Sequence, residues 1–408
     1  MTQHQVIIVG GGLVGGLTAL LLAKAGIQAT VLDASPILQA EQVLSQTNPR
    51  VLAINLASMK LMQYAGIWSH LQRHEPYSGM QVWHRDGMGE VMFGHASQRM
   101  PMQQDWLGSM VEPSILNLAI QTELQAQVKD YRTQVQVTHI ERFPHSWQVT
   151  LATGEILHTP LVIGADGANS FVRQQAGIGL DVLNYHETAI SCAIRTEQPH
   201  QHVARQIFLP TGPLAFLPMQ SLNQVESGHW QSVVWTLPTD YAEEYQQLDD
   251  EVFKQKIAQA SHYMLGDVLD VVSRAAFPLL ARQAQSYVAD GLALVGDAAH
   301  VIHPLAGQGV NLGCLDAAVL VDCLAKDLQR GAWANVQTLR KYEHQRRLHN
   351  SMMMHSMSAL GWVNKWQVQP LQWLRSEGMN VVAKQAKLIE FFSQQASGLQ
   401  ALSQTQYI

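Results

Sequence analysis

Apolar positions near the beginning of the chain follow the pattern of a strand, a helix and a second strand. Residues 5–9 are a short β-branched run that ends at Gly10, and residues 13–25 are an apolar run of helix length that stops at Gly26. Residues 29–32 form a second short apolar run. Short β-branched runs indicate buried strands, and a longer apolar run before a glycine indicates a helix. The pattern therefore predicts a βαβ unit at the start of the fold.

Later in the chain the pattern changes twice. Short strand-like runs at 189–194, 205–208, 214–217 and 232–236 have the spacing of an antiparallel sheet. After an apolar strand at 292–295 the pattern is helical to the end. We therefore expect an α/β protein, in which a Rossmann-like nucleotide-binding domain is interleaved with an antiparallel-sheet substrate domain and followed by C-terminal helices. The expected boundaries are 1–75, 100–180 and 280–345 for the first domain, 76–99 and 181–279 for the second, and 346–408 for the helices.

Composition supports two domains in a reducing compartment. A chain of 408 residues that is 47% hydrophobic exceeds what one core usually organises. The cysteines Cys192, Cys314 and Cys323 are widely spaced and form no CxxC pair, so we expect neither a disulfide framework nor a metal site. No segment approaches the roughly 18–20 continuous apolar residues of a membrane span. We expect a cytoplasmic protein, and the sequence leaves open a peripheral position on the inner membrane.

A glycine turn lies between the first predicted strand and helix. In the pattern Gly10-x-Gly12-x-x-Gly15, the first glycine permits a tight turn, the second lets a pyrophosphate approach the backbone, and the third lets the helix pack on the strand. Asp33 closes the second strand, where an acid accepts hydrogen bonds from ribose hydroxyls. A turn used only for packing is the alternative. The sequence predicts dinucleotide binding by Gly10, Gly12, Leu13, Val14, Gly15 and Asp33.

Two further motifs must decide between NAD and FAD. The strand at 161–163 runs into Gly164-Ala165-Asp166-Gly167, which is either a hairpin turn or, given Ser170 and Arg173 after it, the approach to a helix. The strand at 292–295 runs into Gly296-Asp297, and 307–311 (Gly-Gln-Gly-Val-Asn) then opens another helix. The N-terminus of such a helix stabilises developing negative charge.

Taken together, the three motifs resemble those of the class A flavoprotein aromatic hydroxylases of the para-hydroxybenzoate hydroxylase type. Within that group the chain most resembles the bacterial ubiquinone-biosynthesis hydroxylases. The similarity covers about residues 5–350 and includes 50–54, 164–170, 277–279 and 303–311. The resemblance implies FAD as cofactor, NAD(P)H as transient electron donor and O2 as co-substrate. It also implies that a flavin hydroperoxide hydroxylates a polyprenyl phenol or benzoquinol ring in ubiquinone biosynthesis.

The resemblance assigns roles residue by residue. Gly10, Gly12, Gly15 and Asp33 would hold the ADP half of FAD, and Asp297 would bind the ribityl chain. Asp166 belongs to the motif associated with both FAD and the nicotinamide donor. The flavin pyrimidine would lie near Gly307, Gln308, Gly309, Val310 and Asn311. The candidates nearest the reaction are Arg50, His303 and Pro304.

Each of these candidates also has a structural interpretation. Arg50 could pair with a surface carboxylate, and His303 could be an ordinary loop histidine. His300 is expected to be structural, and Cys314 and Cys323 are expected in the core.

The resemblance is divided over which carbon of the substrate ring is hydroxylated. The enzyme for the first ring hydroxylation, at C5, is resembled at Pro199, 204–206 and His303, whereas the demethoxyquinol hydroxylase, which acts at C6, is resembled at Gly15-Gly16, Gly212-Pro213 and 173–179. We favour C5.

The C-terminal region differs in charge from the rest of the chain. The net charge is −6, yet residues 340–408 hold eight Lys or Arg against three Glu and no Asp, so the main body is acidic and unsuited to nucleic acid. The region also contains Met352, Met353, Met354, Met357, Trp362, Trp366, Trp373, Phe391 and Phe392. It could meet a membrane surface or other ubiquinone-biosynthesis proteins, or it could be an amphipathic helix packed on the body.

Two rival functions of the protein remain, a flavin hydroxylase of a soluble aromatic compound and a flavin-bound non-catalytic subunit.

Overall fold

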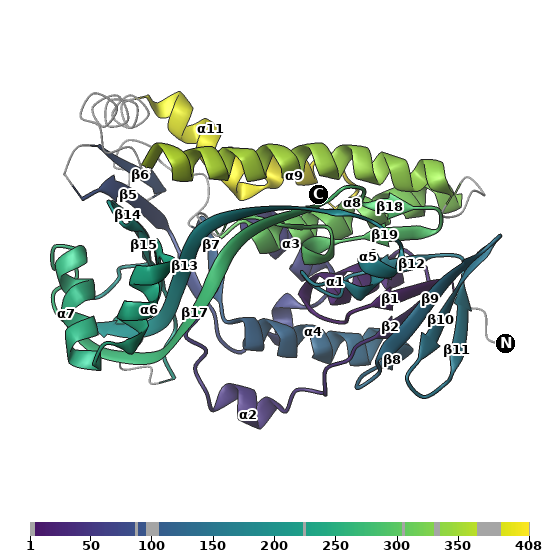
Figure 1. The fold of residues 1–408 in the computed structure, drawn as a ribbon, viewed down its shortest axis with the longest axis horizontal. Helices are drawn as coiled ribbons and strands as arrows, with labels where there is room; N and C mark the ends of the chain where they lie inside the picture. The colour runs from purple at the N-terminus through teal and green to yellow at the C-terminus, as the bar shows by residue number, and fades with distance from the viewer. Residues whose placement is uncertain are drawn as a thin grey trace.

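Two sheets organise the molecule (Figure 1). The computed structural model describes residues 5–85, 89–94, 106–222, 226–303, 307–329, 335–364 and 385–407. One sheet has six strands and the other has eight. The long curved strands β13 (Leu180–Thr196) and β17 (Val268–Ala284) run between the two parts of the molecule (Figure 1).

The six-stranded sheet is parallel except at one edge, and its strands come from distant parts of the chain. In spatial order they are β18 (Val288–Ala289), β19 (Leu292–Leu294), β12 (Val162–Gly164), β1 (Val6–Val9), β2 (Ala29–Leu32) and β8 (Asp130–Arg132). Only the pairing of β18 with β19 is antiparallel. Strands of a parallel sheet are buried on both faces, which explains why β1 is uniformly apolar and buried. The order confirms the Rossmann-like, interleaved fold.

Helices cover the six-stranded sheet. α1 (Leu13–Lys24) packs against both α4 (Pro113–Gln127) and α8 (Gly309–Gln329). Cys314 and Cys323 are buried on α8, which confirms the expectation that they are core residues. The single core formed here also includes residues from both ends of the chain, such as Val6 and Leu402.

The eight-stranded sheet contains the predicted antiparallel strands. Its order is β20 (His300–Val301), β17, β13, β16 (Trp230–Pro238), β15 (Gly212–Pro218), β14 (Val203–Leu209), β5 (Gly79–His84) and β6 (Glu90–Gly94). The pairing of β14 with β5 is parallel, and the others are antiparallel. The helices α6 (Thr239–Gln247) and α7 (Asp250–Ala260) cover one face, where Trp235, Phe253 and Ile257 share a core.

Two smaller sheets and several short helices complete the fold. The strands β3 (Leu52–Asn55), β7 (Gly108–Val111) and β4 (Glu75–Tyr77) form one three-stranded sheet, and β9 (Val137–Phe143), β10 (Ser146–Leu151) and β11 (Ile156–Thr159) form another. The polar residues 34–50, which follow Asp33, contain one short helix, α2 (Ala40–Leu44). Two short helices follow β3 and β12, α3 (Leu56–Tyr64) and α5 (Phe171–Gln175).

The C-terminal helices run along the nucleotide-binding part, and one of them also contacts β6 of the eight-stranded sheet. α9 (Val336–Asn364) runs along α8 (Figure 1), and α11 (Ala386–Ser397) and α12 (Leu399–Leu402) follow. α12 contacts α3 and α8. Trp366 and Trp373 lie outside the described residues, as do the side chains of Phe391 and Phe392. Among the helices that the structure describes, none is both long and apolar enough to span a bilayer.

Candidate cofactor and active site

Two of the three glycines in the first turn are required by the protein itself. Gly10 has φ of +102°, and a Cβ there would lie 2.4 Å from the Ala165 carbonyl oxygen. A Cβ on Gly15 would lie 2.0 Å from the Gly10 oxygen. A Cβ on Gly12 would meet no heavy atom within 4 Å. The fold therefore leaves room beside Gly12 alone, where a phosphate can approach the backbone.

The start of α1 fits a bound phosphate, and Asp33 lies beside it. Gly12 is the N-cap residue of α1 and offers no side-chain cap, so the first N–H groups of the helix are left for a ligand. The Asp33 carboxylate accepts hydrogen bonds from the backbone N–H groups of Gly11 and Ser35, both at 2.7 Å. Each oxygen keeps a second lone pair, which suits ribose hydroxyls.

The third motif packs directly on the first. A Cβ on Gly296 would lie 2.9 Å from Val14, and one on Gly313 would lie 2.7 Å from the same side chain. Val14 is therefore held between the strand end and α8, which places Asp297 next to the glycine turn. The Asp297 side chain is accessible to solvent although many protein atoms surround it. These atoms keep water away from the Asp297 carboxylate, and this desolvation raises its pKa. The charges of His300 and Arg50 act in the other direction and lower it.

Arg50 lies near Asp297 and beside an aromatic ring. Its charge acts on the Asp297 carboxylate, and its guanidinium carbon lies 5.7 Å from the centre of the Phe277 ring on β17. No carboxylate of the described residues lies within ion-pair distance of Arg50. The surface ion pair is therefore not seen among the described residues, and the role of the exposed Arg50 toward the cofactor stays a prediction.

The first turn of α8 is joined to β3 by one side chain. The Asn311 amide donates to the Ala53 carbonyl at 2.8 Å, and its oxygen accepts the Asn55 backbone N–H at 3.0 Å. Gly307 adopts φ of +61°, with Ala53 beside it. Asn311 thus fixes the start of α8, including Gly309 and Val310, against the strand that follows Arg50. Pro304 lies outside the described residues, while Gln308 lies within them.

His303 is buried beside two residues that sequence reasoning did not single out. Its Nε2 lies 3.6 Å from the Glu187 carboxylate, and the Tyr185 ring meets it edge-on with centroids 4.7 Å apart. Only 3% of His303 is exposed. No spacing rule links β13 to residue 303, so only the pairing of β20, β17 and β13 could bring these residues together.

Asp166 starts a helix. Its carboxylate accepts hydrogen bonds from the Ser170 hydroxyl at 2.5 Å and from the Val172 N–H at 3.0 Å, and Ser170 caps α5 by accepting the Arg173 N–H. The helix interpretation of this motif is confirmed, and the hairpin interpretation is wrong. Its role toward FAD or the nicotinamide donor stays a prediction.

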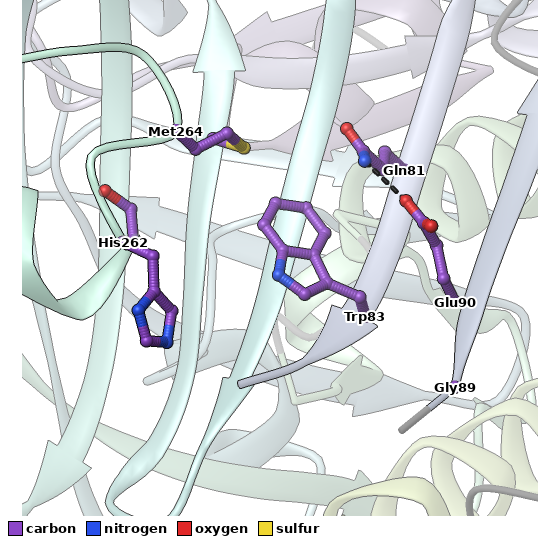
Figure 2. A pocket seen from close by; sticks show the side chains of 7 residues that line it. Gln81, Trp83, Gly89, Glu90, His262 and Met264 are labelled. Carbon is purple, nitrogen blue, oxygen red and sulfur yellow. Dashed lines mark hydrogen bonds between the residues drawn. The ribbon is translucent and has the colours of Figure 1, made fainter. Parts of the chain in front are cut away.

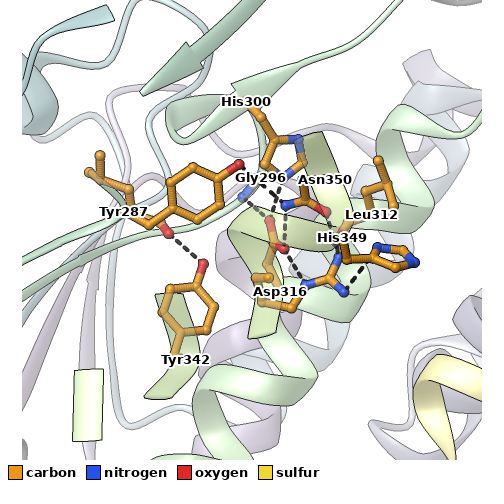
Figure 3. Close-up of polar contacts among 10 residues, drawn as sticks. Tyr287, Gly296, His300, Leu312, Asp316, Tyr342, His349 and Asn350 are labelled. Atoms are coloured by element: carbon orange, nitrogen blue, oxygen red, sulfur yellow. Dashed lines mark hydrogen bonds and ion pairs between the residues drawn. The ribbon is translucent and has the colours of Figure 1, made fainter. Parts of the chain in front are cut away.

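A buried polar network centred on Asp316 of α8 holds the backbone of Gly296 (Figure 3). Asp316 on α8 accepts the Gly296 N–H at 3.1 Å and hydrogen bonds from His300 at 2.5 Å and Arg346 at 2.7 Å. Burial alone would raise the pKa of Asp316, but the charges and hydrogen bonds of His300 and Arg346 outweigh it and lower the pKa to about 2. His300 therefore has the structural role expected of it, and Asp316, Arg346 and Asn350 were not found from the sequence.

Other polar features lie apart from the predicted site residues. A cavity of about 330 Å³ on the β5–β6 edge is lined by Gln81, Trp83, Gly89, Glu90, Ser261, His262 and Met264 (Figure 2). Glu75, His200 and His202 have ligand atoms within 4.8 Å of one another. Two interactions already join these residues: His202 Nδ1 lies 2.8 Å from the Glu75 carboxylate, and His200 Nδ1 accepts the His202 backbone N–H at 3.0 Å. We interpret the group as a turn that its own side chains hold in place.

Comparison with known proteins identifies the cofactor. The family described as the FAD binding domain matches residues 3–356. The chain belongs to this family. The flavoprotein is an FAD-dependent monooxygenase, and the open space at Gly12, the uncapped start of α1 and the position of Asp297 fit that cofactor.

Several relatives extend over nearly the whole flavoprotein. It is 36% identical to the 3-demethoxyubiquinol 3-hydroxylase of Escherichia coli, over 92% of this chain and 93% of that protein. It is 35% identical to the ubiquinone hydroxylase UbiL of Rhodospirillum rubrum, over 97% and 89%. Human mitochondrial ubiquinone biosynthesis monooxygenase COQ6 is 30% identical, over 93% and 89%.

Solved structures show the same fold. The p-nitrophenol 4-monooxygenase PnpA of Pseudomonas putida superposes with a TM-score of 0.77 at 18% identity, covering 98% of this flavoprotein and 99% of that chain. PqsL of Pseudomonas aeruginosa, described as a probable FAD-dependent monooxygenase, gives 0.73 at 20% identity, over 93% and 99%.

Proposed function

We propose that this flavoprotein hydroxylates the phenol or quinol ring of a polyprenylated ubiquinone precursor, at C5, with NAD(P)H as electron donor. Similarity at 30–36% identity to three ubiquinone hydroxylases, across more than nine tenths of this chain, carries the ring-hydroxylation part of the proposal. The choice of C5 rests only on Pro199, 204–206 and His303, since one of the three relatives is a demethoxyubiquinol hydroxylase, the type that corresponds to the C6 alternative. The flavin motifs within that similarity converge at one place in the fold. A flavin-bound non-catalytic subunit would not need Arg50 to lie beside Asp297.

The protein's own residues would bind and orient the cofactor. Gly12 and the start of α1 would hold the pyrophosphate, Asp33 the adenosine ribose, and Asp297 the ribityl chain. The first turn of α8, fixed by Asn311, would direct N–H groups at the flavin pyrimidine. When bound, FAD supplies the redox chemistry that activates oxygen.

The decisive experiment compares substrates. NAD(P)H oxidation and oxygen uptake by the purified yellow protein are measured with short-chain prenylphenols and with hydroxybenzoates, and mass spectrometry and NMR identify the hydroxylated carbon. We expect prenylphenols to stimulate both rates and to yield the C5 product. Stimulation by hydroxybenzoates alone would contradict the quinone substrate, and stimulation by no phenol would contradict the monooxygenase function. Asp297→Ala should release the flavin, and full retention would contradict its placement.

We propose that one face of α9 contacts the anionic membrane surface where a polyprenyl substrate resides. Along this exposed face Arg340 and Lys341 are followed by Leu348, Met352 and Trp362, of which the last three are 60%, 62% and 73% exposed. Cations and tryptophan on one helical face suit an anionic lipid interface.

Vesicle binding tests this surface. The double variant Met352→Ser/Trp362→Ser should sediment less with vesicles containing phosphatidylglycerol, because exposed apolar anchors are removed without disturbing the core. Tyr241→Ser, which changes an apolar side chain 49% exposed on α6, is the matched control. Equal sedimentation of wild type and double variant would reject the membrane role. If the double variant instead lost binding to a partner protein, this face of α9 would be a protein-docking surface.

A further inference from the structure

The segment that carries Arg50 is not part of any helix or strand. Residues 45–51 lie between the end of α2 at Leu44 and the start of β3 at Leu52, and all of them are irregular. An irregular segment keeps one conformation only where other groups bind its backbone, because it has no ladder of its own. Such groups are therefore needed if Arg50 is to stay beside Asp297, on which its charge acts.

Arg73 binds the beginning of this segment. Its guanidinium donates to the Leu44 carbonyl at 3.1 Å and to the Gln46 carbonyl at 2.7 Å. It also donates to the Glu112 carboxylate, from Nε at 2.6 Å and from Nη2 at 3.2 Å. One planar guanidinium thus holds two carbonyls and a carboxylate in a fixed geometry, which the ammonium of a lysine does not reproduce.

Glu112 binds the next part of the segment. It is the N-cap residue of α4, yet its side chain makes no capping hydrogen bond to that helix. The carboxylate instead accepts the Asn48 N–H at 2.6 Å, and the Asn48 side-chain oxygen accepts the Arg50 N–H at 3.0 Å. The contacts that begin at Arg73 therefore end at the backbone of Arg50.

The pair of Arg73 and Glu112 is buried, with 8% and 4% of the two residues exposed. A buried ion pair is weak evidence for stability, because apolar residues of similar volume often stabilise a protein as well or better. Its bonds to three backbone groups of the segment indicate instead that it fixes a conformation. On the other side, the Ser232 hydroxyl of β16 donates to the Pro49 carbonyl at 2.6 Å. The segment is thus held between the start of α4 and the eight-stranded sheet.

We propose that Arg73 and Glu112 are positioning residues, which hold Arg50 where it attracts the cofactor. The pyrophosphate of FAD is an anion, and a cation that is already fixed in place binds it more strongly than one that is ordered only on binding. Arg73 and Glu112 act through Arg50. The inference rests on the proposed function, which places bound FAD at Asp297 beside Arg50.

A double-mutant cycle on FAD affinity tests this role. Arg50→Gln should weaken FAD binding to the apoprotein about tenfold, because a charge-assisted contact is lost. Arg73→Lys keeps the buried charge but loses the planar fork, and it should weaken FAD binding about fivefold. In the Arg50→Gln background the same lysine substitution should change the affinity less than about twofold, because the residue that it positions has already been replaced.

Equal losses of affinity from Arg73→Lys in both backgrounds would show simple support of the fold and would overturn the proposal. FAD binding to Arg50→Gln as tight as to wild type would overturn it as well. Glu112→Gln should repeat the result of Arg73→Lys in both backgrounds. Arg195→Lys, which makes the same change in the Arg195–Asp270 pair of the eight-stranded sheet, is the matched control and should keep the affinity within about twofold. Urea unfolding of every apoprotein establishes that it is folded.

Hydrogen exchange of the wild type guards against variants that fail to fold. The N–H groups of Asn48 and Arg50 should exchange at least about tenfold more slowly than in an unstructured peptide, because side chains accept both. Exchange at the peptide rate would overturn the positioning role. In Arg73→Lys both groups should exchange faster, while those of β1 keep their protection. Failure of this role is read from FAD binding and exchange, whereas failure of the proposed function is read from the lack of stimulation by any phenol.

Discussion

At the scale of single residues, the first glycine turn separates demands of the fold from demands of the ligand. Gly10 and Gly15 are enclosed by the protein's own backbone, whereas Gly12 borders open space. The same residue type therefore serves two purposes within six positions. Sequence spacing predicted the motif, but only the positions of the surrounding atoms distinguish the two purposes.

This difference predicts opposite phenotypes for two alanine substitutions. Gly15→Ala should lower the free energy of unfolding by about 2 kcal/mol or more, because its Cβ would lie 2.0 Å from a backbone oxygen. Gly12→Ala should unfold within about 1 kcal/mol of wild type yet bind FAD at least about tenfold more weakly. Urea unfolding of the apoprotein and flavin titration measure the two effects. Similar losses of stability in both variants would contradict the assignment.

Asp316 is a second residue whose energetics depend on its surroundings. It is fully buried, and its hydrogen bonds to Gly296, His300 and Arg346 link α8, α9 and the strand end at the third motif. Removing one partner of a buried ion pair leaves the other charge uncompensated, which typically destabilises a protein by about 3–5 kcal/mol.

Asp316→Asn should therefore lower the free energy of unfolding by about 3 kcal/mol near pH 7. The lowered pKa of Asp316, about 2 in the folded protein, means that its contribution is complete above about pH 4 and is lost as the pH falls toward 2. The stability gap between wild type and variant should narrow over that range in urea titrations. Asp290→Asn, which breaks the exposed pair with Arg142, is the control and should change stability by less than about 1 kcal/mol. A constant gap between pH 4 and 2 would refute this.

At the scale of elements, a bulge in β13 between Asn184 and Thr188 brings Tyr185 and Glu187 to the same partner, His303. A regular strand would alternate its side chains, so Tyr185 and Glu187 would share a face without being gathered at one partner. The bulge requires His186 to adopt a left-handed backbone conformation, which is unfavourable for a residue with a Cβ.

His186→Gly should consequently stabilise the protein by about 0.5 kcal/mol, since glycine adopts this conformation without strain. The control is His139→Gly on β9, an exposed strand histidine with an ordinary backbone conformation, which should destabilise by about 0.5–1 kcal/mol. Thermal unfolding compares them. Destabilisation of the same size in both variants would show that the bulge is not strained.

At the scale of the whole molecule, the end of the chain supports the cofactor site. The Asn55 side-chain amide donates to the Ala396 carbonyl in the last turn of α11, while its backbone N–H donates to the Asn311 side-chain oxygen at the start of α8. Leu402 is fully buried, and Tyr407 packs edge-on against Tyr64. The last residues are therefore continuous with the core that holds the flavin motifs.

Deleting residues 385–408 should weaken FAD binding about tenfold and lower the melting temperature, because α3 and α8 lose the segment that buries them. A shorter deletion after Gln404 keeps Leu402 and the Ala396 carbonyl and should bind FAD nearly as wild type. Flavin titration of both truncated proteins measures this. Unchanged affinity in the longer truncation would separate the C-terminal helices from the cofactor site.

The sequence by itself determined the βαβ start and the strands of the second sheet, because these depend on local periodicity. Its motifs also resemble those of the flavin family, but they left a hairpin and a helix open after Asp166. Tertiary structure alone decided which side chains meet: Arg50 with Phe277, Asn311 with β3, Asp316 with Arg346, and His303 with Glu187. Each of these contacts joins residues far apart in the chain. Strand order, a bulge and helix packing create them, and no local pattern of residues encodes those arrangements.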